Sequence, residues 1–322
     1  MKMKRIFAGM VLLLLCACVC LTGCAPQEGE AYTFFVPDGA PALAVANVIQ
    51  SGKIGNHPVT VSIASGDAVK DKCASGAADL AILPTNAAVK ICSVNEDYVI
   101  FSVNVRGLLY VIGKENISSL KELEGKTVLS IGLANTGEYL FKRILDDAQV
   151  AYDGTSGVTL QYYTDGSEAG KLLMAGKGDF ALLGEPATTN ILNKAQQNGK
   201  TFYRVFDLQQ LWKETTGAKE TGYPQACVLV KRSALQQKGF AEALTDVLEA
   251  NAAFLRANVA SLNDLLKSVN SALDLVYTQD LLDRCNLTMQ KAAERKEEIV
   301  AYLQEFTGPF ASLVKDEMFY EG

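Results

Sequence analysis

The chain has 322 residues, of which 36 are acidic and 30 are basic, and its formal net charge at pH 7 is −6. This length is enough for two domains with cores of their own, and the acidic balance argues against a nucleic-acid partner. The chain holds one histidine, and none of the cysteines after residue 24 lies two residues from another. We therefore predict no metal and no cofactor, because zinc sites and Cys/His catalytic pairs need such residues close together.

Residues 1–23 have the pattern of a signal peptide. Three basic residues among the first five precede an apolar stretch at 6–20, which is shorter than the roughly 20 residues of a transmembrane helix. The sequence Leu-Thr-Gly-Cys at 21–24 resembles the lipobox of bacterial lipoproteins. This resemblance implies cleavage before Cys24, an acyl chain such as palmitate on its thiol, and a location at the extracytoplasmic face of the cell membrane. An ordinary secretory peptide or an uncleaved anchor is the alternative.

Residues 24–31 are small, polar and acidic, which is typical of a short tether before a fold that starts at Tyr32. Removal of residues 1–23, which hold three basic residues and no acidic one, changes the net charge from −6 to −9. Four cysteines remain besides Cys24, and in an exported protein they are either buried free thiols or disulfide partners. They are Cys73, Cys92, Cys227 and Cys285.

Apolar β-rich runs alternate with helical segments as far as residue 230, which predicts an α/β fold with largely parallel sheets. The predicted strands are 33–36, 59–64, 80–83, 98–105, 108–112, 127–131, 161–164, 180–183 and 226–230. Helices are predicted between them, and everything after Ser233 is predicted to be helical. Apolar residues at helical spacing between 289 and 306 indicate a helix that packs on the core, with a partner-docking helix as the alternative.

Two segments in the second half of the chain carry a family resemblance. Gly125 and Lys126 follow a short helix and precede a strand, and Gly-Lys-Gly-Asp at 176–179 leads through a strand to Gly-Glu-Pro at 184–186. The first half has a similar helix end, aspartate and strand at 75–82. These segments resemble the substrate-binding proteins of ABC importers for nitrate, sulfonates, taurine and thiamine precursors.

The resemblance covers most of residues 32–260 and implies a type 2 periplasmic-binding fold, with two mixed sheets flanked by helices and a hinge between two lobes. The implied division is lobe 1 at 32–113, lobe 2 at 114–222 and a return to lobe 1 at 223–322. A monomer of this kind captures a small molecule between its lobes and delivers it to an ABC permease, without being an enzyme. An enzyme or an extracytoplasmic sensor on the same fold is the alternative.

The candidate ligand-binding residues lie in the turns after the predicted strands, because ligands of open α/β sheets bind beyond the carboxyl ends of the strands. Helix N-termini there offer free backbone donors, and the polar side chains either contact a ligand or cap the helices. The candidates are Asp38, Gly39, Ala40, Ser65, Gly66, Asp67, Thr85, Asn86, Arg106, Asn135, Thr136, Gly137 and Glu185.

The charges of these turns predict the kind of ligand. Arg106 is the only basic residue among them, whereas Asp38, Asp67, Asp165 and Glu185 are acidic. Because so many carboxylates would repel an anion, we expect a neutral or cationic small molecule. An enzyme on this fold would draw its general base from the same carboxylates.

Overall fold

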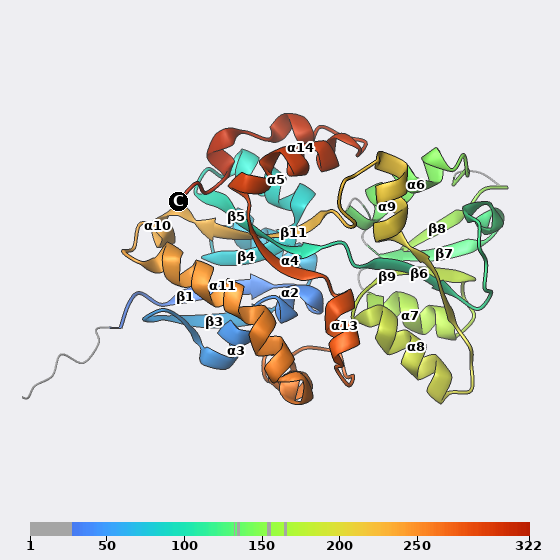
Figure 1. Ribbon diagram of the computed structural model, residues 1–322, viewed down its shortest axis with the longest axis horizontal. Helices are drawn as coiled ribbons and strands as arrows, with labels where there is room; N and C mark the ends of the chain where they lie inside the picture. Colours follow the sequence, from blue (N-terminus) through green and yellow to red (C-terminus); the bar gives the residue numbers. More distant parts are fainter. Residues whose placement is uncertain (1–27, 132, 134–135, 153–155, 164–165) are drawn as a thin grey trace, which may run out of the picture.

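The computed structural model describes residues 28–131, 133, 136–152, 156–163 and 166–322. Within this part the chain forms two lobes, each built around one mixed sheet that is flanked by helices. Figure 1 shows the two lobes side by side, with the C-terminal helices on the lobe that also holds the start of the fold. The expected two-lobed α/β architecture with two mixed sheets is therefore confirmed.

Seven strands form the sheet of lobe 1. They are β1 (Tyr32–Val36), β2 (Lys53–Ile54), β3 (His57–Ile63), β4 (Leu80–Pro84), β5 (Tyr98–Arg106), β11 (Pro224–Lys231) and β12 (Leu287–Lys291). Their order across the sheet is β12-β5-β11-β4-β1-β3-β2. β1 runs parallel to β3 and β4, whereas the pairs β4–β11, β11–β5, β5–β12 and β2–β3 are antiparallel. The parallel strands β1, β3 and β4 therefore end at one edge of the lobe.

Five strands form the sheet of lobe 2. They are β6 (Leu109–Gly113), β7 (Thr127–Ile131), β8 (Thr159–Tyr163), β9 (Phe180–Gly184) and β10 (Tyr203–Asp207). Their order is β10-β6-β9-β7-β8, with β7 parallel to β8 and β9 and with β6 antiparallel to β9 and β10. As in lobe 1, three parallel strands end at the same edge.

Helices connect and cover these strands. In lobe 1 they are α2 (Ala40–Leu43), α3 (Ala46–Ser51), α4 (Gly66–Ala74), α5 (Thr85–Val94), α10 (Arg232–Leu235), α11 (Phe240–Ala257), α12 (Leu262–Ser268), α13 (Gln279–Arg284) and α14 (Lys296–Gln304). In lobe 2 they are α6 (Thr136–Asp147), α7 (Gly166–Met174), α8 (Ala187–Gln197) and α9 (Leu208–Thr216). No helix in the described part of the chain is long and apolar enough to span a bilayer.

All nine strands predicted from the sequence are present, with ends shifted by a few residues. The prediction that everything after Ser233 is helical is wrong at Leu287–Lys291, which forms the edge strand β12 beside β5, and at 271–278, which is neither helix nor strand. β12 is short and largely half-buried on both faces, and its Met289 also fits the helical spacing of the apolar residues that follow, so the sequence pattern did not separate this strand from a helix. β2 and β10 were not predicted either.

The chain passes from lobe 1 to lobe 2 at Gly107 and not after residue 113. The expected boundary at 113/114 fails because Leu109–Gly113 pairs with β9 and β10 and so belongs to the sheet of lobe 2. The return passage lies at Gly222, just before β11, close to the expected residue 223. Both glycines have positive φ angles, 46° at Gly107 and 90° at Gly222.

The first passage is tightly packed against the second. A Cβ atom on Gly107 would lie 2.8 Å from Gln209 Cγ and 3.0 Å from Tyr223 Cε1. The Gln209 Oε1 atom accepts hydrogen bonds from the Leu109 backbone N–H at 2.8 Å and from the Tyr223 hydroxyl at 3.0 Å. Side chains of both passages therefore fix the chain where the lobes are joined.

The described chain begins against His57. The Gly29 N–H donates to Asn56 O at 3.0 Å, and the Glu30 carbonyl oxygen lies 3.1 Å from His57 Nδ1. The His57 ring packs edge-on against Phe240 of α11 with a centroid separation of 5.2 Å. Residues 29 and 30, which we expected to belong to a tether, are thus attached to lobe 1.

Cys73, Cys92, Cys227 and Cys285 are buried free thiols. Burial raises the pKa of the Cys73, Cys92 and Cys227 thiols to about 12. These groups therefore stay neutral at physiological pH and are poor nucleophiles, since the thiolate is the reactive form.

We expect the native protein to resist thiol reagents at these four positions. Iodoacetamide at pH 8 should label none of them within the time that labels a free peptide thiol, and all four after denaturation, as counted by intact mass. Rapid labelling of the native protein would contradict the burial of these side chains.

Candidate binding cleft between the lobes

The carboxyl ends of the parallel strands in the two lobes face each other. In lobe 1, β1, β3 and β4 lead into α2, α4 and α5, and in lobe 2, β7, β8 and β9 lead into α6, α7 and α8. The two edges meet where a Cβ on Gly39 would lie 3.4 Å from Pro186 Cδ and where Thr136 Oγ1 donates to Asn86 Oδ1 at 3.1 Å. We call the region between these edges the cleft; the first turns of α5 and α6 lie on its two sides.

Thr85, Asn86, Thr136 and Gly137 are brought together in the cleft, as the sequence predicts. All four are buried, and the Asn86–Thr136 hydrogen bond connects the two lobes. Thr85 has a structural partner in addition, because its hydroxyl donates to Pro224 O at 2.5 Å. Asn135 lies outside the described residues, as does Cys24.

Asp38 is at the cleft but its carboxylate is occupied. Its Oδ1 accepts from the Ser271 hydroxyl at 2.7 Å, and its Oδ2 accepts from the Ala272 N–H at 2.8 Å. Asp38 thus holds the segment before α13 on lobe 1. Its neighbours Gly39 and Ala40 are buried, and Gly39 has a φ of 92° where it faces Pro186.

Ser65, Gly66 and Asp67 lie at the start of α4, where helix capping explains their side chains. Ser65 Oγ accepts from the Ala68 N–H at 3.3 Å, and Asp67 is exposed and pairs with Lys70 at 2.6 Å. No contact of these three residues with lobe 2 occurs among the described hydrogen bonds and ion pairs.

Arg106, the expected basic group of the cleft, is already paired. Its guanidinium binds Glu298 of α14 through two hydrogen bonds of 2.6 and 3.0 Å, and Gln290 Oε1 accepts a third at 3.1 Å. Arg106 is 6% exposed. It therefore ties β5 to the C-terminal segment at the lobe junction and has no free face for an anion.

Glu185 is the centre of an ion-pair cluster that joins the lobes. Its side chain is fully buried and lies 2.5 Å from Arg204 NH2 of lobe 2 and 3.2 Å from Arg284 Nε of α13 in lobe 1. Thr189 contributes its N–H and its hydroxyl to the same carboxylate at 3.0 and 2.9 Å. The Arg204 guanidinium also stacks over the Tyr110 ring at 4.7 Å. The sequence analysis proposed Glu185 as a cleft residue but did not predict its ion pairs with Arg204 and Arg284.

An aromatic wall of five residues closes the cleft on the side of α14. Its members come from α6, α9, the return passage and the α14 segment, namely Tyr139, Trp212, Tyr223, Tyr302 and Phe306. Tyr302 stacks on Tyr223 at 5.4 Å and meets Trp212 edge-on at 5.3 Å, while Phe306 stacks on Tyr139 at 5.5 Å. The wall therefore contacts both lobes.

The buried hydroxyl of Tyr302 lies beside the Thr136 side chain, a potential partner, but makes no hydrogen bond of good geometry within the described residues. Burial raises the pKa of Tyr302 well above its usual value, so the group stays protonated and can donate. A buried polar atom without a partner costs about 1–3 kcal/mol and calls for an explanation. No sequence pattern pointed to this residue as a ligand contact, because it lies in a helix that was predicted to pack on the core, with partner docking as the alternative.

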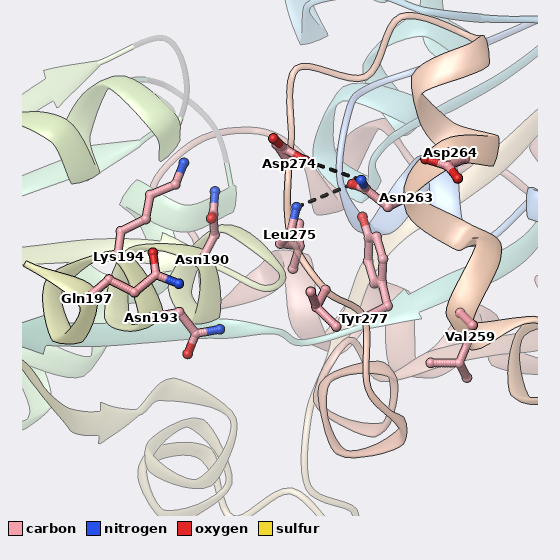
Figure 2. A pocket seen from close by; sticks show the side chains of 12 residues that line it. Asn190, Asn193, Lys194, Gln197, Val259, Asn263, Asp264, Asp274, Leu275 and Tyr277 are labelled. Carbon is pink, nitrogen blue, oxygen red and sulfur yellow. Dashed lines mark hydrogen bonds between the residues drawn. The ribbon is translucent and has the colours of Figure 1, made fainter.

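A separate pocket of about 390 Å³ lies further out between the lobes. Figure 2 shows α8 of lobe 2 on one side and residues 259–277 of lobe 1 on the other. Among the residues that the structure describes, no group of three or more His, Cys, Asp or Glu side chains is arranged to hold a metal ion.

Comparison with solved structures identifies the fold. An ABC transporter protein from Parabacteroides distasonis is 19% identical with a TM-score of 0.74, over 90% of this chain and 99% of that one. The periplasmic aliphatic sulphonate binding protein SsuA from Escherichia coli is 16% identical with a TM-score of 0.66, over 91% of this chain and 92% of that one. The alkanesulfonate-binding protein SsuA from Xanthomonas axonopodis pv. citri, bound to MOPS, is 14% identical with a TM-score of 0.62, over 91% and 97% of the two chains.

The chain has the periplasmic-binding-protein fold. The match extends over nearly the whole length of these proteins, both lobes included. No family model and no curated protein matches the sequence. The similarity at this level of identity establishes the architecture, and the function has to be argued from the cleft.

Proposed function

We propose that this protein is a lipid-anchored, extracytoplasmic solute-binding protein that captures a small molecule in the cleft and delivers it to an ABC permease. The observation that carries the proposal is the Tyr302 hydroxyl, which is buried beside Thr136 between two lobes that touch and makes no hydrogen bond of good geometry. A donor of this kind is stabilised when a solute supplies the missing acceptor. The similar proteins from Escherichia coli and Xanthomonas, which bind sulphonates, support the proposal.

The proposed mechanism is closure of the lobes around the solute. Two passages join the lobes at Gly107 and Gly222, and contacts such as Asn86–Thr136 form only when the edges are close. A solute that contacts both edges favours the closed arrangement by its differential affinity for it. We propose that the protein acts as a monomer in this cycle.

The proposed solute can be an anion, a cation or a neutral molecule. Of the carboxylates that led us to expect a neutral or cationic ligand, Glu185 is paired with two arginines and Asp67 with Lys70, and Asp38 accepts hydrogen bonds from Ser271 and Ala272. Asp165 lies outside the described residues. The α5 and α6 N-termini contribute partial positive charge at the cleft. A binding screen therefore has to include sulfonates as well as amines and neutral heterocycles.

A binding role without catalysis fits the same contacts. An enzyme on this fold would need a free general base in the cleft. Asp38 accepts hydrogen bonds from residues 271 and 272, and Glu185 is bound by two arginines. Neither carboxylate is free to take a proton from a substrate in this arrangement.

The Tyr302→Phe variant tests the cleft. A ligand is first found as a compound that raises the melting temperature of the wild type, in a panel of alkanesulfonates, amines and pyrimidines. Its affinity should fall about tenfold in Tyr302→Phe, while the stability of the free protein should change little, because the deleted hydroxyl makes no hydrogen bond of good geometry.

Tyr223→Phe is the matched control. The Tyr223 hydroxyl donates to Gln209, so this variant should lose about 1 kcal/mol of stability and keep its affinity for the ligand. Equal affinity in wild type and Tyr302→Phe would contradict the proposed role of Tyr302, and a panel without any stabilising compound would contradict the solute classes proposed.

The proposed lipid anchor has its own test. Cys24→Ala removes the thiol that would be acylated, so this variant should appear in the soluble fraction after cell lysis without detergent, whereas the wild type should sediment with membranes. A Ser118→Ala variant, far from the N-terminus, serves as the control. Continued sedimentation of Cys24→Ala would rule out Cys24 as the anchor.

A further inference from the structure

The pocket beyond the cleft has two walls from different lobes. Figure 2 shows Asn190, Asn193, Lys194 and Gln197 on α8 facing the segment that carries Asn263, Asp274, Leu275 and Tyr277. Its volume of about 390 Å³ lies within the range of about 300–1,000 Å³ that is usual for small-molecule sites. Neither Tyr302 nor Thr136 lines it, so it is distinct from the cleft.

On the α8 wall, Asn190 presents its side-chain amide to the pocket. The residue is 6% exposed, and its backbone N–H donates to Pro186 O. Its side chain makes no hydrogen bond to any residue in the described part of the chain, although it points into the pocket (Figure 2). The amide therefore has its donor and acceptor groups available for the hydroxyl or amide groups of a bound molecule.

The opposite wall holds fixed hydrogen-bond acceptors and donors. Asn263 Nδ2 donates to Asp274 Oδ1 at 3.2 Å, and Asn263 Oδ1 accepts from the Leu275 N–H at 3.3 Å. Lys267 pairs with Asp274 at 2.6 Å, and this hydrogen bond holds the pKa of Asp274 below its usual range. The Asp274 carboxylate therefore stays ionised and keeps a second oxygen as an acceptor.

The charges of the pocket nearly cancel. Lys194 lies on one wall, Asp264 and Asp274 lie on the other, and Lys267 compensates Asp274. Four amide side chains supply both donors and acceptors, which suits hydroxyl groups because these also donate and accept. Leu275 and Tyr277 add an apolar surface for carbon–hydrogen faces. These features favour an uncharged, hydroxyl-rich molecule over an ion.

We propose that this pocket is a second binding site, for a polyhydroxylated neutral molecule such as a sugar or a polyol. The molecule bridges α8 of lobe 2 and residues 259–277 of lobe 1, and it therefore stabilises the lobes in contact. Binding of this molecule makes closure of the lobes more favourable, whichever solute occupies the cleft. Each of the two ligands therefore increases the affinity of the protein for the other.

The purified protein is titrated with D-glucose, D-mannitol and myo-inositol at millimolar concentrations. Binding of each probe is measured by NMR. At least one probe should bind the wild type, and its dissociation constant should rise about tenfold in Asn190→Leu, which keeps the size of the side chain but removes the amide. Asn193→Ala, at an exposed position of the same wall, should also weaken binding and covers the case in which Asn190→Leu does not fold.

Two controls separate this site from the cleft. Gln196→Leu changes an exposed residue of α8 that does not line the pocket, and Tyr302→Phe changes the cleft; both should bind the probe as the wild type does. The proposal is overturned if no probe binds, if the pocket variants bind normally, or if Tyr302→Phe loses the probe as well. Preferential binding of an alkanesulfonate or an amine at Asn190 would overturn the proposed ligand class.

Discussion

Replacement of Arg284 by alanine should shift the protein toward an open arrangement and weaken solute binding up to tenfold. Arg284 reaches from α13 of lobe 1 to the buried Glu185 carboxylate of lobe 2, with Nε 3.2 Å from Oε1, and its NH2 lies 3.3 Å from Thr189 Oγ1. A hydrogen bond to a charged group contributes about 1.5 kcal/mol or more, which is about tenfold in an equilibrium constant.

Arg284→Ala should change the equilibrium between the open and closed arrangements more than it changes the free energy of unfolding. Glu185 keeps Arg204 and Thr189 as partners from its own lobe, so the carboxylate is not left alone in the protein interior. Because only the closed population retains the solute, the apparent dissociation constant rises as that population falls. Small-angle scattering of the ligand-free protein should show a larger radius of gyration, and calorimetry should show the weaker binding.

Arg256→Ala is the control for Arg284→Ala. Arg256 pairs with Asp283 of the same lobe at 3.7 Å, and both side chains are about two-thirds exposed, at 68% and 66%. Exposed pairs of this kind contribute about 0–1 kcal/mol, so the radius of gyration and the affinity should stay as in the wild type. Identical behaviour of the two variants would show that the Glu185 cluster does not hold the lobes together.

Gly107→Ala should destabilise the protein by about 2–5 kcal/mol. A side chain at a φ of 46° costs about 1–2 kcal/mol, and the added Cβ would lie 2.8 Å from Gln209 Cγ and 3.0 Å from Tyr223 Cε1, where overpacking costs about 1–3 kcal/mol more. The measurement is the free energy of unfolding from denaturant titration, with the melting temperature as a second readout.

Gly76→Ala separates the two contributions. Gly76 has a similar positive φ of 69°, but nothing lies within 4 Å of the Cβ that alanine would add. This variant should therefore lose only the backbone contribution of about 1–2 kcal/mol. If both variants lose the same stability, the packing of Gln209 and Tyr223 around the first passage does not restrict that position.

The strands were predictable because they are short apolar runs bounded by turns, and nearly all of them are buried inside the sheets. β10 was missed because Tyr203–Asp207 is an edge strand with an exposed tyrosine and a partly buried arginine. The lobe boundary was missed for a different reason: the break between β5 and β6 at Gly107 and Leu108 was predicted, but the sequence does not show which sheet the second strand joins. Only the pairing of β6 with β9 and β10 shows where the sheet changes.

The cleft residues were predictable by position and not by role. Asn86 and Thr136 follow strands, and the rule that ligands bind beyond strand ends placed both correctly at the junction of the lobes. Arg106 was placed at the junction too, but its pairing with Glu298 joins residues 192 positions apart, which no local pattern reveals. The same holds for Tyr302 and for Arg284, whose importance comes from burial and from contacts across the lobes.

The contact between Glu30 and His57 limits how far the body could lie from a membrane under the proposed lipid anchor. If the proposed acyl chain is on Cys24, only residues 24–28 separate it from the first attached residue, Gly29. Five extended residues span about 17 Å, so the end of lobe 1 near β3 and α11 stays beside the bilayer, while lobe 2 lies at the other end of the long axis (Figure 1). In the proposed cycle lobe 1 is then the half held near the membrane, and closure around a solute moves mainly lobe 2 relative to the membrane and to the proposed permease.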